Sequence, residues 1–164
     1  MTQNTPTIPS LPPNSVFRRI SPEDKALVRT FFAQMNGESR TFFNRNDGNE
    51  ISAIRYTDGE TKNREYFMIE KDGEMIGLVF LYDTHRNIPW LGIAVHEAYK
   101  GMGIGRYLIA EMIEYAHKLG RGGILLTTHV ANIRGQGLYA RMGFERLGMH
   151  DCGEVLYLYQ CAAS

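Results

Sequence analysis

The stretch that decides the fold is LGIAVHEAYKGMGIGRYLIAEMI, residues 91–113. It begins inside an apolar run over residues 89–95 that is typical of a central strand, and it then passes through glycines at alternate positions. Apolar residues at helical spacing follow, and Gly120 ends the predicted helix. One face of that helix is formed by Ile104, Leu108, Met112 and Ala116.

The turn between this strand and this helix has the sequence Lys100-Gly101-Met102-Gly103-Ile104-Gly105. Glycines lack a Cβ atom, so backbone N–H groups can converge there, at the positive end of the helix dipole. Such a turn suits a pyrophosphate, and it also serves a tight strand-to-helix connection without a ligand. The dinucleotide fingerprint GxGxxG fails at Arg106, and no P-loop string occurs.

The segments on both sides of this unit predict further strands and helices. Downstream we expect a strand over residues 123–130, a short helix over 133–142 closed by Gly143, and a final strand over 155–160. Upstream, the pair Asp72-Gly73 predicts a β-hairpin, because it separates two runs rich in strand-forming residues. These runs cover residues 65–70 and 75–82.

The first third is predicted to be mainly helical. A short strand over residues 16–20 precedes Ser21-Pro22-Glu23-Asp24, which is a helix-start signal, and Gly37 is expected to end the helix that follows. A weaker helical region covers residues 38–56, with a break at 46–49. The whole order predicts an α/β fold, a single domain with a mixed, twisted central β-sheet flanked by α-helices.

Length and charge bound the class of protein. The 164 residues suggest one domain over residues 16–164, preceded by a disordered or loosely attached polar, proline-rich lead over 1–15. Eighteen basic residues balance eighteen acidic ones, which argues against a general nucleic-acid or anionic-membrane binder. The longest apolar stretch, residues 75–82, is too short for a membrane span of about 20 residues.

Cysteine and histidine usage indicates a protein without a metal site. Cys152 and Cys161 have neither the CxxC nor a zinc spacing, and the five histidines are scattered. We therefore expect reduced thiols, no metal and a cytoplasmic location.

Two motifs together carry a family resemblance. The glycine turn matches the loop pattern [QR]-x-x-G-x-[GA], with Lys100 in the first position and Gly103 and Gly105 in place. Asn132 to Tyr139, followed by Gly143-Phe144, matches N-x-x-A-x-x-L-Y-x-x-x-G-F with Gly135 for alanine. With a helix and a strand between them, the two motifs make the chain resemble the GNAT superfamily of acetyl-coenzyme A (acetyl-CoA) dependent N-acetyltransferases. The resemblance covers residues 66–160 well and the first third loosely.

This resemblance implies roles for particular residues. In such proteins the strand ending at Val95 parts from the next parallel strand, and pantetheine lies in the gap, paired with the backbones of Ile93, Ala94 and Val95. The Val95 amide would also stabilise the oxyanion. The pyrophosphate would be held by Lys100, Gly101, Met102, Gly103, Ile104, Gly105 and Arg106, with Asn132 and Gly135 on the coenzyme's other side.

The resemblance also implies a catalytic acid, Tyr139, which would protonate the departing thiolate. A tyrosine suits this role because its ordinary pKa near 10 keeps it protonated at neutral pH. Taken alone, Tyr139 would be an ordinary half-buried aromatic residue. Gly135 and Gly137 each cost a helix about 1 kcal/mol relative to alanine, which we expect a close ligand or backbone to offset.

The acceptor side departs from the family. Pro89 stands where some members carry a glutamate base, so deprotonation of the amine must use another group or a water chain. The nearby candidates, none of which the sequence favours, are Asp83, His85, His96, Glu97, His129 and His150. Residues 38–43 and 56–59 faintly resemble domains that modify protein lysines. Phe31, Phe32, Phe42 and Phe43 either line an acceptor pocket or form plain core.

The leading hypothesis is an enzyme that transfers acetyl from acetyl-CoA to a primary amine, either a small molecule or a protein lysine. The reaction would proceed by direct attack in a ternary complex, in a monomer or a homodimer. One alternative is a non-catalytic coenzyme A binding or sensor module. The other is an interaction protein whose glycine loop holds no ligand.

Overall fold

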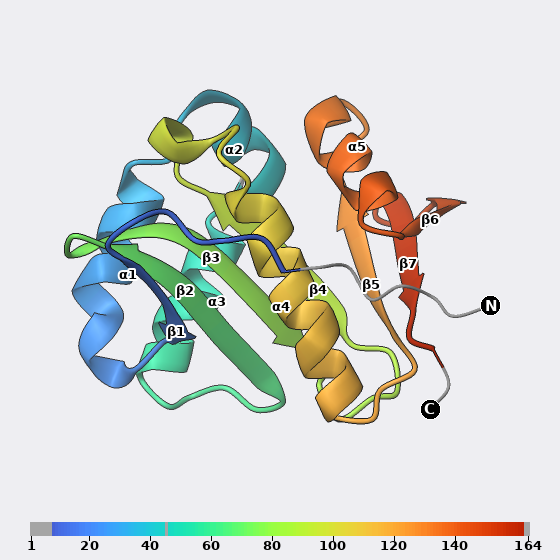
Figure 1. Cartoon of the computed structure of the whole chain (residues 1–164), viewed down its shortest axis with the longest axis horizontal. Coiled ribbons are helices and arrows are strands. Elements are labelled where there is room, and N and C mark those ends of the chain that lie inside the picture. The colour runs from blue at the N-terminus through green and yellow to red at the C-terminus, as the bar shows by residue number, and fades with distance from the viewer. Residues whose placement is uncertain (1–7, 45, 163–164) are drawn as a thin grey trace.

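The computed structural model describes residues 8–44 and 46–162, and its centre is a seven-stranded sheet (Figure 1). The strand order is β1-β2-β3-β4-β5-β7-β6, in which β4 and β5 are parallel and the other neighbours are antiparallel. The strands are β1 (Ser15–Arg19), β2 (Arg64–Lys71), β3 (Glu74–Tyr82), β4 (Trp90–Val95), β5 (Gly123–Thr128), β6 (Glu145–Met149) and β7 (Val155–Gln160).

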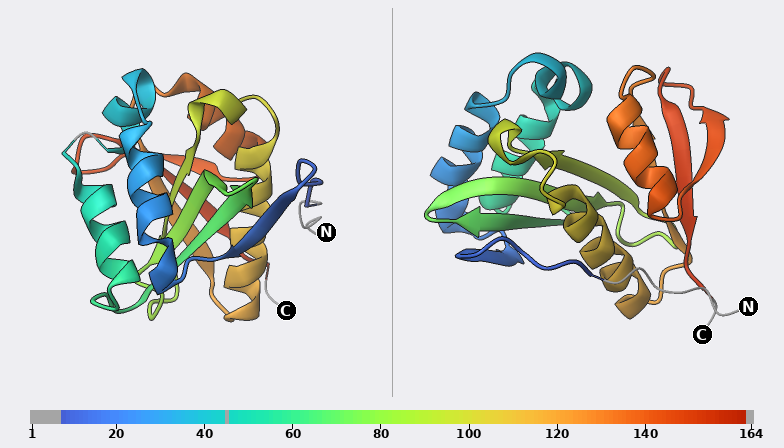
Figure 2. Two further views of the ribbon diagram at one scale, coloured as in Figure 1. Left: turned by 90° about the vertical axis from the view of Figure 1, so that its left-hand side faces the viewer. Right: turned by 45° about the horizontal axis from the view of Figure 1, so that its top comes forward.

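Helices cover both faces of this sheet (Figure 2). On one face lie α1 (Lys25–Ala33), α2 (Gly37–Phe43) and α3 (Gly48–Thr57). On the other lie α4 (Ile104–Lys118) and α5 (Ile133–Arg141). Two short 3₁₀ helices, Pro22–Asp24 and Glu97–Tyr99, complete the described elements. The predicted α/β class, with a mixed central sheet flanked by helices, is confirmed.

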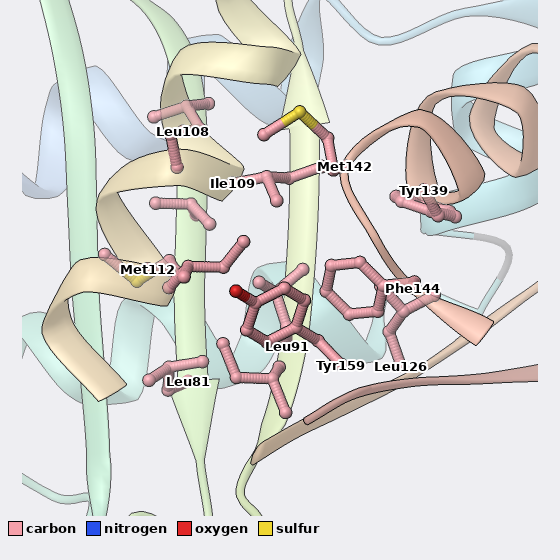
Figure 3. Close-up of a cluster of buried hydrophobic side chains, with 14 of the residues drawn as sticks. Leu81, Leu91, Leu108, Ile109, Met112, Leu126, Tyr139, Met142, Phe144 and Tyr159 are labelled. Carbon is pink, nitrogen blue, oxygen red and sulfur yellow. The ribbon is translucent and has the colours of Figure 1, made fainter. Parts of the chain in front are cut away.

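Alternation along the strands divides the core into two layers. In β3, Leu78 and Phe80 pack towards α1 and α3, whereas Val79 and Leu81 pack towards α4. Figure 3 shows the second layer, where Leu108 and Met112 of α4 meet the strands and Tyr139 enters from α5. Because both layers are buried, the sheet is held rigidly on both sides, which fixes the positions of β4 and β5.

Most expected elements are found, and the hairpin turn is the clearest case. Asp72 has a φ of 50° and Gly73 a φ of 81°, so both central residues are left-handed, as a type I′ turn requires. Ser21 and Asp24 form the capping box expected from their spacing. Buried Asp24 also accepts hydrogen bonds from Arg18, which together with the Ser21 contacts lowers the pKa of its carboxyl to about 2.

Two boundary predictions were wrong, and one strand was missed. Gly37 begins α2 rather than ending α1, which stops at Ala33; with a φ of 48°, Gly37 makes the sharp turn between the two helices. The strand expected over residues 123–130 ends at Thr128, where the chain turns towards α5. Strand β6 was missed because it is an edge strand, mostly exposed, and irregular between Arg146 and Gly148.

The lead predicted over residues 1–15 falls partly outside the described residues, which begin at Ile8. Within the described part, Leu11 packs against the core layer under α4, and β1 starts at Ser15. The domain division stays a prediction. No helix in residues 8–44 and 46–162 is both long enough and apolar enough to span a bilayer. Cys152 and Cys161 are both free thiols.

Candidate active site

The site is built where β4 and β5 separate. Their parallel pairing consists of one register pair, Trp90 with Leu125, beside a hydrogen bond of 2.9 Å from the Leu125 N–H to the Pro89 carbonyl. Beyond Trp90 no described strand pairs with β4 on this side, and the two strands diverge towards their carboxyl ends (Figure 1). The expected split in the sheet is therefore present.

The register with β3 decides which backbone groups of β4 face this split. The His96 N–H donates to the Ile76 carbonyl at 2.9 Å, and Pro89 bonds to β5, so the groups of even-numbered residues point to β3 and those of odd-numbered residues to β5. Ile93 and Val95 consequently direct their N–H and C=O groups into the split. Ala94 directs its backbone to Leu78 of β3, so it does not join the predicted set.

A cavity of about 370 Å³ occupies the split. Ile93, Asn132 and Tyr139 line it, as do Phe42 and Phe43 of α2. Phe43 belongs to the layer under α1 and α3 and Tyr139 to the layer under α4, so the cavity is lined from both faces of the sheet. The two phenylalanines therefore border the cavity, whereas Phe31 and Phe32 are plain core.

The glycine turn leads into α4 with its amides uncovered. Gly103 caps the helix with a φ of 83° and no side-chain hydrogen bond, and Gly101 has a φ of 81°. A Cβ atom built at either glycine would meet no atom of the described residues within 4 Å. The first N–H groups of a helix have no partner within it, so those of Ile104, Gly105 and Arg106 are free for an anion. The side chains of Met102 and Arg106 are exposed.

Two residues of the turn, Gly105 and Lys100, face other parts of the protein rather than open space. A Cβ atom at Gly105 would lie 2.9 Å from Leu138 Cδ2, so this glycine lets α4 pack against α5. The Lys100 ammonium is paired with side chains of the protein itself: its Nζ lies 3.1 Å from Glu97 Oε1 and donates to the Ser39 hydroxyl at 2.8 Å. The Lys100 ammonium therefore ties the turn to α2.

The start of α5 is closed by its own residues. The Asn132 side chain accepts the Gly135 N–H at 3.1 Å and donates to the Thr128 hydroxyl at 2.9 Å. A Cβ atom at Gly135 would lie 2.4 Å from Asn132 Nδ2. Gly135 is thus explained by this cap rather than by the ligand or backbone approach expected from the sequence.

Tyr139 lies in the split at the side of α5. It is 7% exposed, and its ring packs against Phe144 and Tyr157. Burial raises the pKa of its hydroxyl to about 12, a hydrogen bond with Thr128 lowers it, and the charge of Glu154 raises it further. Tyr139 is therefore protonated throughout the physiological pH range and can serve as a proton donor.

Of the six base candidates from the sequence, His129 lines the cavity. His85 is exposed, and Glu97 is held by Lys100 and Ser39. Asp83, His96 and His150 lie outside the cavity lining. In the described part of the chain, no three His, Cys, Asp or Glu side chains gather as a metal site would require.

Sequence reasoning missed a carboxylate in the cavity wall, that of Glu154. It stands directly before β7, 10 residues beyond Phe144 at the end of the second motif, so only the pairing of β7 with β5 brings it to the site. No spacing in the sequence could have found it.

The fold thus combines a split parallel strand pair with a helix start whose first amides are uncovered. The sequence profile of the acetyltransferase (GNAT) family matches residues 26–144, well over half of the chain. The chain belongs to the acetyltransferase (GNAT) family, and the resemblance seen in its two motifs is confirmed.

Individual relatives match part of the chain. An uncharacterized protein of Mycobacterium leprae is 39% identical over 70 residues, which is 43% of this chain and 17% of that protein. N-alpha-acetyltransferase RimI of Mycobacterium tuberculosis is 37% identical over 71 residues, which is 43% of this chain and 39% of RimI. The match thus spans less than half of each of these relatives.

The fold has solved counterparts. The structure of PaiA N-acetyltransferase from Thermoplasma acidophilum in complex with coenzyme A has a TM-score of 0.70 and 17% identity to this chain. The alignment covers 89% of this chain and 98% of that one. At this identity the likeness shows the fold.

Proposed function

We propose that this protein transfers the acetyl group of acetyl-CoA to a primary amine by direct attack in a ternary complex. The observation that carries the proposal is the split between β4 and β5, with the protonated Tyr139 hydroxyl at its wall. A gap in a sheet leaves backbone groups without strand partners, and an extended amide-containing ligand can satisfy them.

The residues on either side of the split fit the coenzyme. Ile93 and Val95 offer N–H and C=O groups at the spacing of a strand, which suits the amides of pantetheine. The free amides at the start of α4 suit the pyrophosphate, and the open space beside Gly101 and Gly103 leaves room for it. Both features lie at the carboxyl ends of β4 and β5, where ligands of α/β sheets commonly bind.

The chemistry follows from what faces the split. The amine nitrogen attacks the thioester carbonyl carbon, and the Val95 N–H stabilises the negative charge that develops on the carbonyl oxygen. As the carbon–sulfur bond breaks, Tyr139 gives its proton to the sulfur. With a pKa of about 12, its hydroxyl keeps that proton until the leaving sulfur develops charge.

The acceptor is a small molecule or a protein amine. The aromatic rings of Phe42, Phe43 and Tyr82 border the cavity and favour a primary amine that arrives as a cation. A relative named as an N-alpha-acetyltransferase supports including peptide N-termini beside lysine peptides, polyamines, amino acids and aminoglycosides.

The test is thiol release from acetyl-CoA across that panel, with coenzyme A binding measured separately by calorimetry. We expect micromolar to millimolar binding of the coenzyme and amine-dependent thiol release with one class of acceptor. Binding without thiol release for any amine would favour the sensor alternative. Absence of coenzyme binding would contradict the proposal. Thermal unfolding gives a second measure of binding, because a ligand at about 100 times its Kd should raise the free energy of unfolding by about 2.7 kcal/mol.

A further inference from the structure

The mechanism above leaves one charged group of the cavity without a role, the carboxylate of Glu154. It is partly buried, and its Oε1 accepts a hydrogen bond of 2.9 Å from the Thr127 hydroxyl. Among the described residues, no salt bridge uses this carboxylate. An unpaired, oriented carboxylate in a cavity that must admit an amine calls for an explanation.

The position of Glu154 relative to Tyr139 follows from β5. Thr127 and Thr128 are consecutive in that strand, so their side chains point to opposite faces of the sheet. Thr128 contacts Asn132 and Tyr139 on the face of α4 and α5, whereas Thr127 contacts Glu154. The carboxylate and the phenol therefore approach the split from opposite faces.

The histidines near the site are less suitable proton acceptors. The His129 Nδ1 accepts the Ala131 N–H at 3.0 Å, so in the neutral ring the proton sits on Nε2 and neither nitrogen has a free lone pair. His96 and His150 accept the N–H two residues ahead in the same way. His129 also packs its ring on Phe42, with centroids 5.0 Å apart.

We propose that Glu154 is the general base that takes the proton from the attacking amine, with Thr127 holding its carboxylate in position. The inference rests on the proposed acetyl transfer. The amine arrives as an ammonium ion, so Glu154 first takes one proton from the nitrogen and frees the lone pair, which then forms the bond to the carbonyl carbon. As the carbon–sulfur bond breaks, Tyr139 supplies a proton to sulfur, and the second proton that the nitrogen loses returns to Tyr139 through solvent. Glu154 releases its own proton to solvent, so an ammonium ion and a thioester give an amide, a thiol and one free proton.

The arrangement separates the two proton transfers in space. The amine arrives from the face of α2 and β3, where Glu154 meets it, and the thiol departs on the face of α5, where Tyr139 lies. An anionic base also selects a cationic acceptor. Several titratable or charged groups surround Glu154. They are Tyr82, Asp83, His129, Tyr139, His150 and Cys152. The Arg64 guanidinium lies over the Tyr82 ring, 5.2 Å from its centroid.

The test compares Glu154→Gln with Glu145→Gln, an exposed glutamate on β6. Glutamine keeps the size of Glu154 and can still bond to Thr127, but it cannot take a proton. We expect kcat/KM at pH 7 to fall by about 10²–10⁴-fold in Glu154→Gln, with calorimetric coenzyme affinity unchanged. Glu145→Gln should match the wild type.

The pH profile distinguishes a base from a structural residue. Wild-type kcat/KM should level off, whereas that of Glu154→Gln should keep rising towards the pKa of a free alkylamine, about 10.4. Thr127→Val should give a smaller loss, because the carboxylate remains but is no longer held. This second variant keeps the inference testable where Glu154→Gln does not fold.

Three results would overturn the inference. The first is a folded Glu154→Gln enzyme with the rate and pH profile of the wild type, which leaves the proposed acetyl transfer intact. The second is a His129→Gln variant that shows the rate loss and the rising pH profile expected of Glu154→Gln, because this result would identify His129 as the base. The third is a wild-type protein that binds coenzyme A but acetylates no amine, which removes the proposed function as well.

Discussion

The starts of α4 and α5 look alike in sequence and differ in structure. Both helices follow one of the two parallel strands, and both have glycines within their first turn. Gly103 caps α4 without a side chain and leaves the first amides free, whereas Asn132 caps α5 and takes the Gly135 N–H itself.

The difference teaches that a glycine next to a helix start does not by itself mark a ligand site. At α4 the space beside Gly101 and Gly103 is open, and the helix dipole faces that space. At α5 the space beside Gly135 is filled by Asn132, and the helix serves to bring Tyr139 to the split. Under the proposed function, the start of α4 would bind the coenzyme and α5 would position the catalytic tyrosine.

The largest effect expected from this comparison is on catalysis, at α5. Tyr139→Phe removes the proton donor and keeps the ring, so kcat should fall by about 10²–10⁴-fold while coenzyme affinity holds. Stopped-flow kinetics with the best amine, beside calorimetry, would measure both. Full kcat in the variant, with chemistry limiting, would mean that α5 carries no acid.

The second effect is on stability at high pH. Burial raises the pKa of Tyr139 from 10.0 to about 12, so the folded state favours the neutral phenol. That stabilisation is complete below pH 10 and is lost as the pH rises from 10 to 12, on the order of 2 kcal/mol. Denaturant unfolding of wild type and Tyr139→Phe should show the difference between their free energies of unfolding shrinking over this range. A difference in the free energy of unfolding that stays constant from pH 10 to 12 would mean that burial does not raise the pKa of the Tyr139 hydroxyl.

The third effect is on binding, at α4. Gly103→Val puts a branched side chain into the open space of the turn, and coenzyme affinity should fall at least tenfold, about 1.4 kcal/mol. Gly120→Val is the matched control, since Gly120 has a φ of 71°, open surroundings and a place at the other end of the same helix. Both variants should lose similar stability, about 1–2 kcal/mol from left-handed strain. Equal affinity in the two would remove the turn from the coenzyme site.

The smallest effect is on the cap of α5. Asn132→Ala removes both hydrogen bonds of that side chain, and the free energy of unfolding should fall by about 1 kcal/mol. Coenzyme affinity should change less than in Gly103→Val. A tenfold loss of affinity in a stable Asn132→Ala protein would show that α5 binds the coenzyme directly, and the contrast between the two helices would fail.

Local signals predicted most of the fold. The Asp72-Gly73 turn, the Ser21 capping box and the apolar face of α4 each depend on residues within a few positions of one another, and each is present. Strand β6 has no such signal, because its residues are exposed and it is held as a strand by pairing with β7. Gly37 also misled, since a left-handed glycine serves the end of one helix and the start of the next equally well.

The candidate site follows a motif along the chain in two places. Consecutive residues form the turn from Gly101 to Arg106 and the helix face that carries Tyr139, so their placement could be predicted, while the binding and catalytic roles given to them stay predictions. Ala94 was misplaced, because the direction of a strand's N–H and C=O groups is set by the register with β3. The internal pairing of Lys100 with Glu97 and Ser39 likewise depends on α2, far away in sequence.

The sequence alone determined the fold class, the family and the glycine turn at the start of α4, because each is encoded by periodicity or by spacing within a short segment. Only the tertiary structure decided which backbone groups enter the split, why Gly135 is a glycine, and that Glu154 faces the cavity. These depend on strand register and on pairing between β5 and β7, which join residues that are distant along the chain. A side chain's chemistry is written in the sequence, but its neighbours are set by the packing of the whole fold.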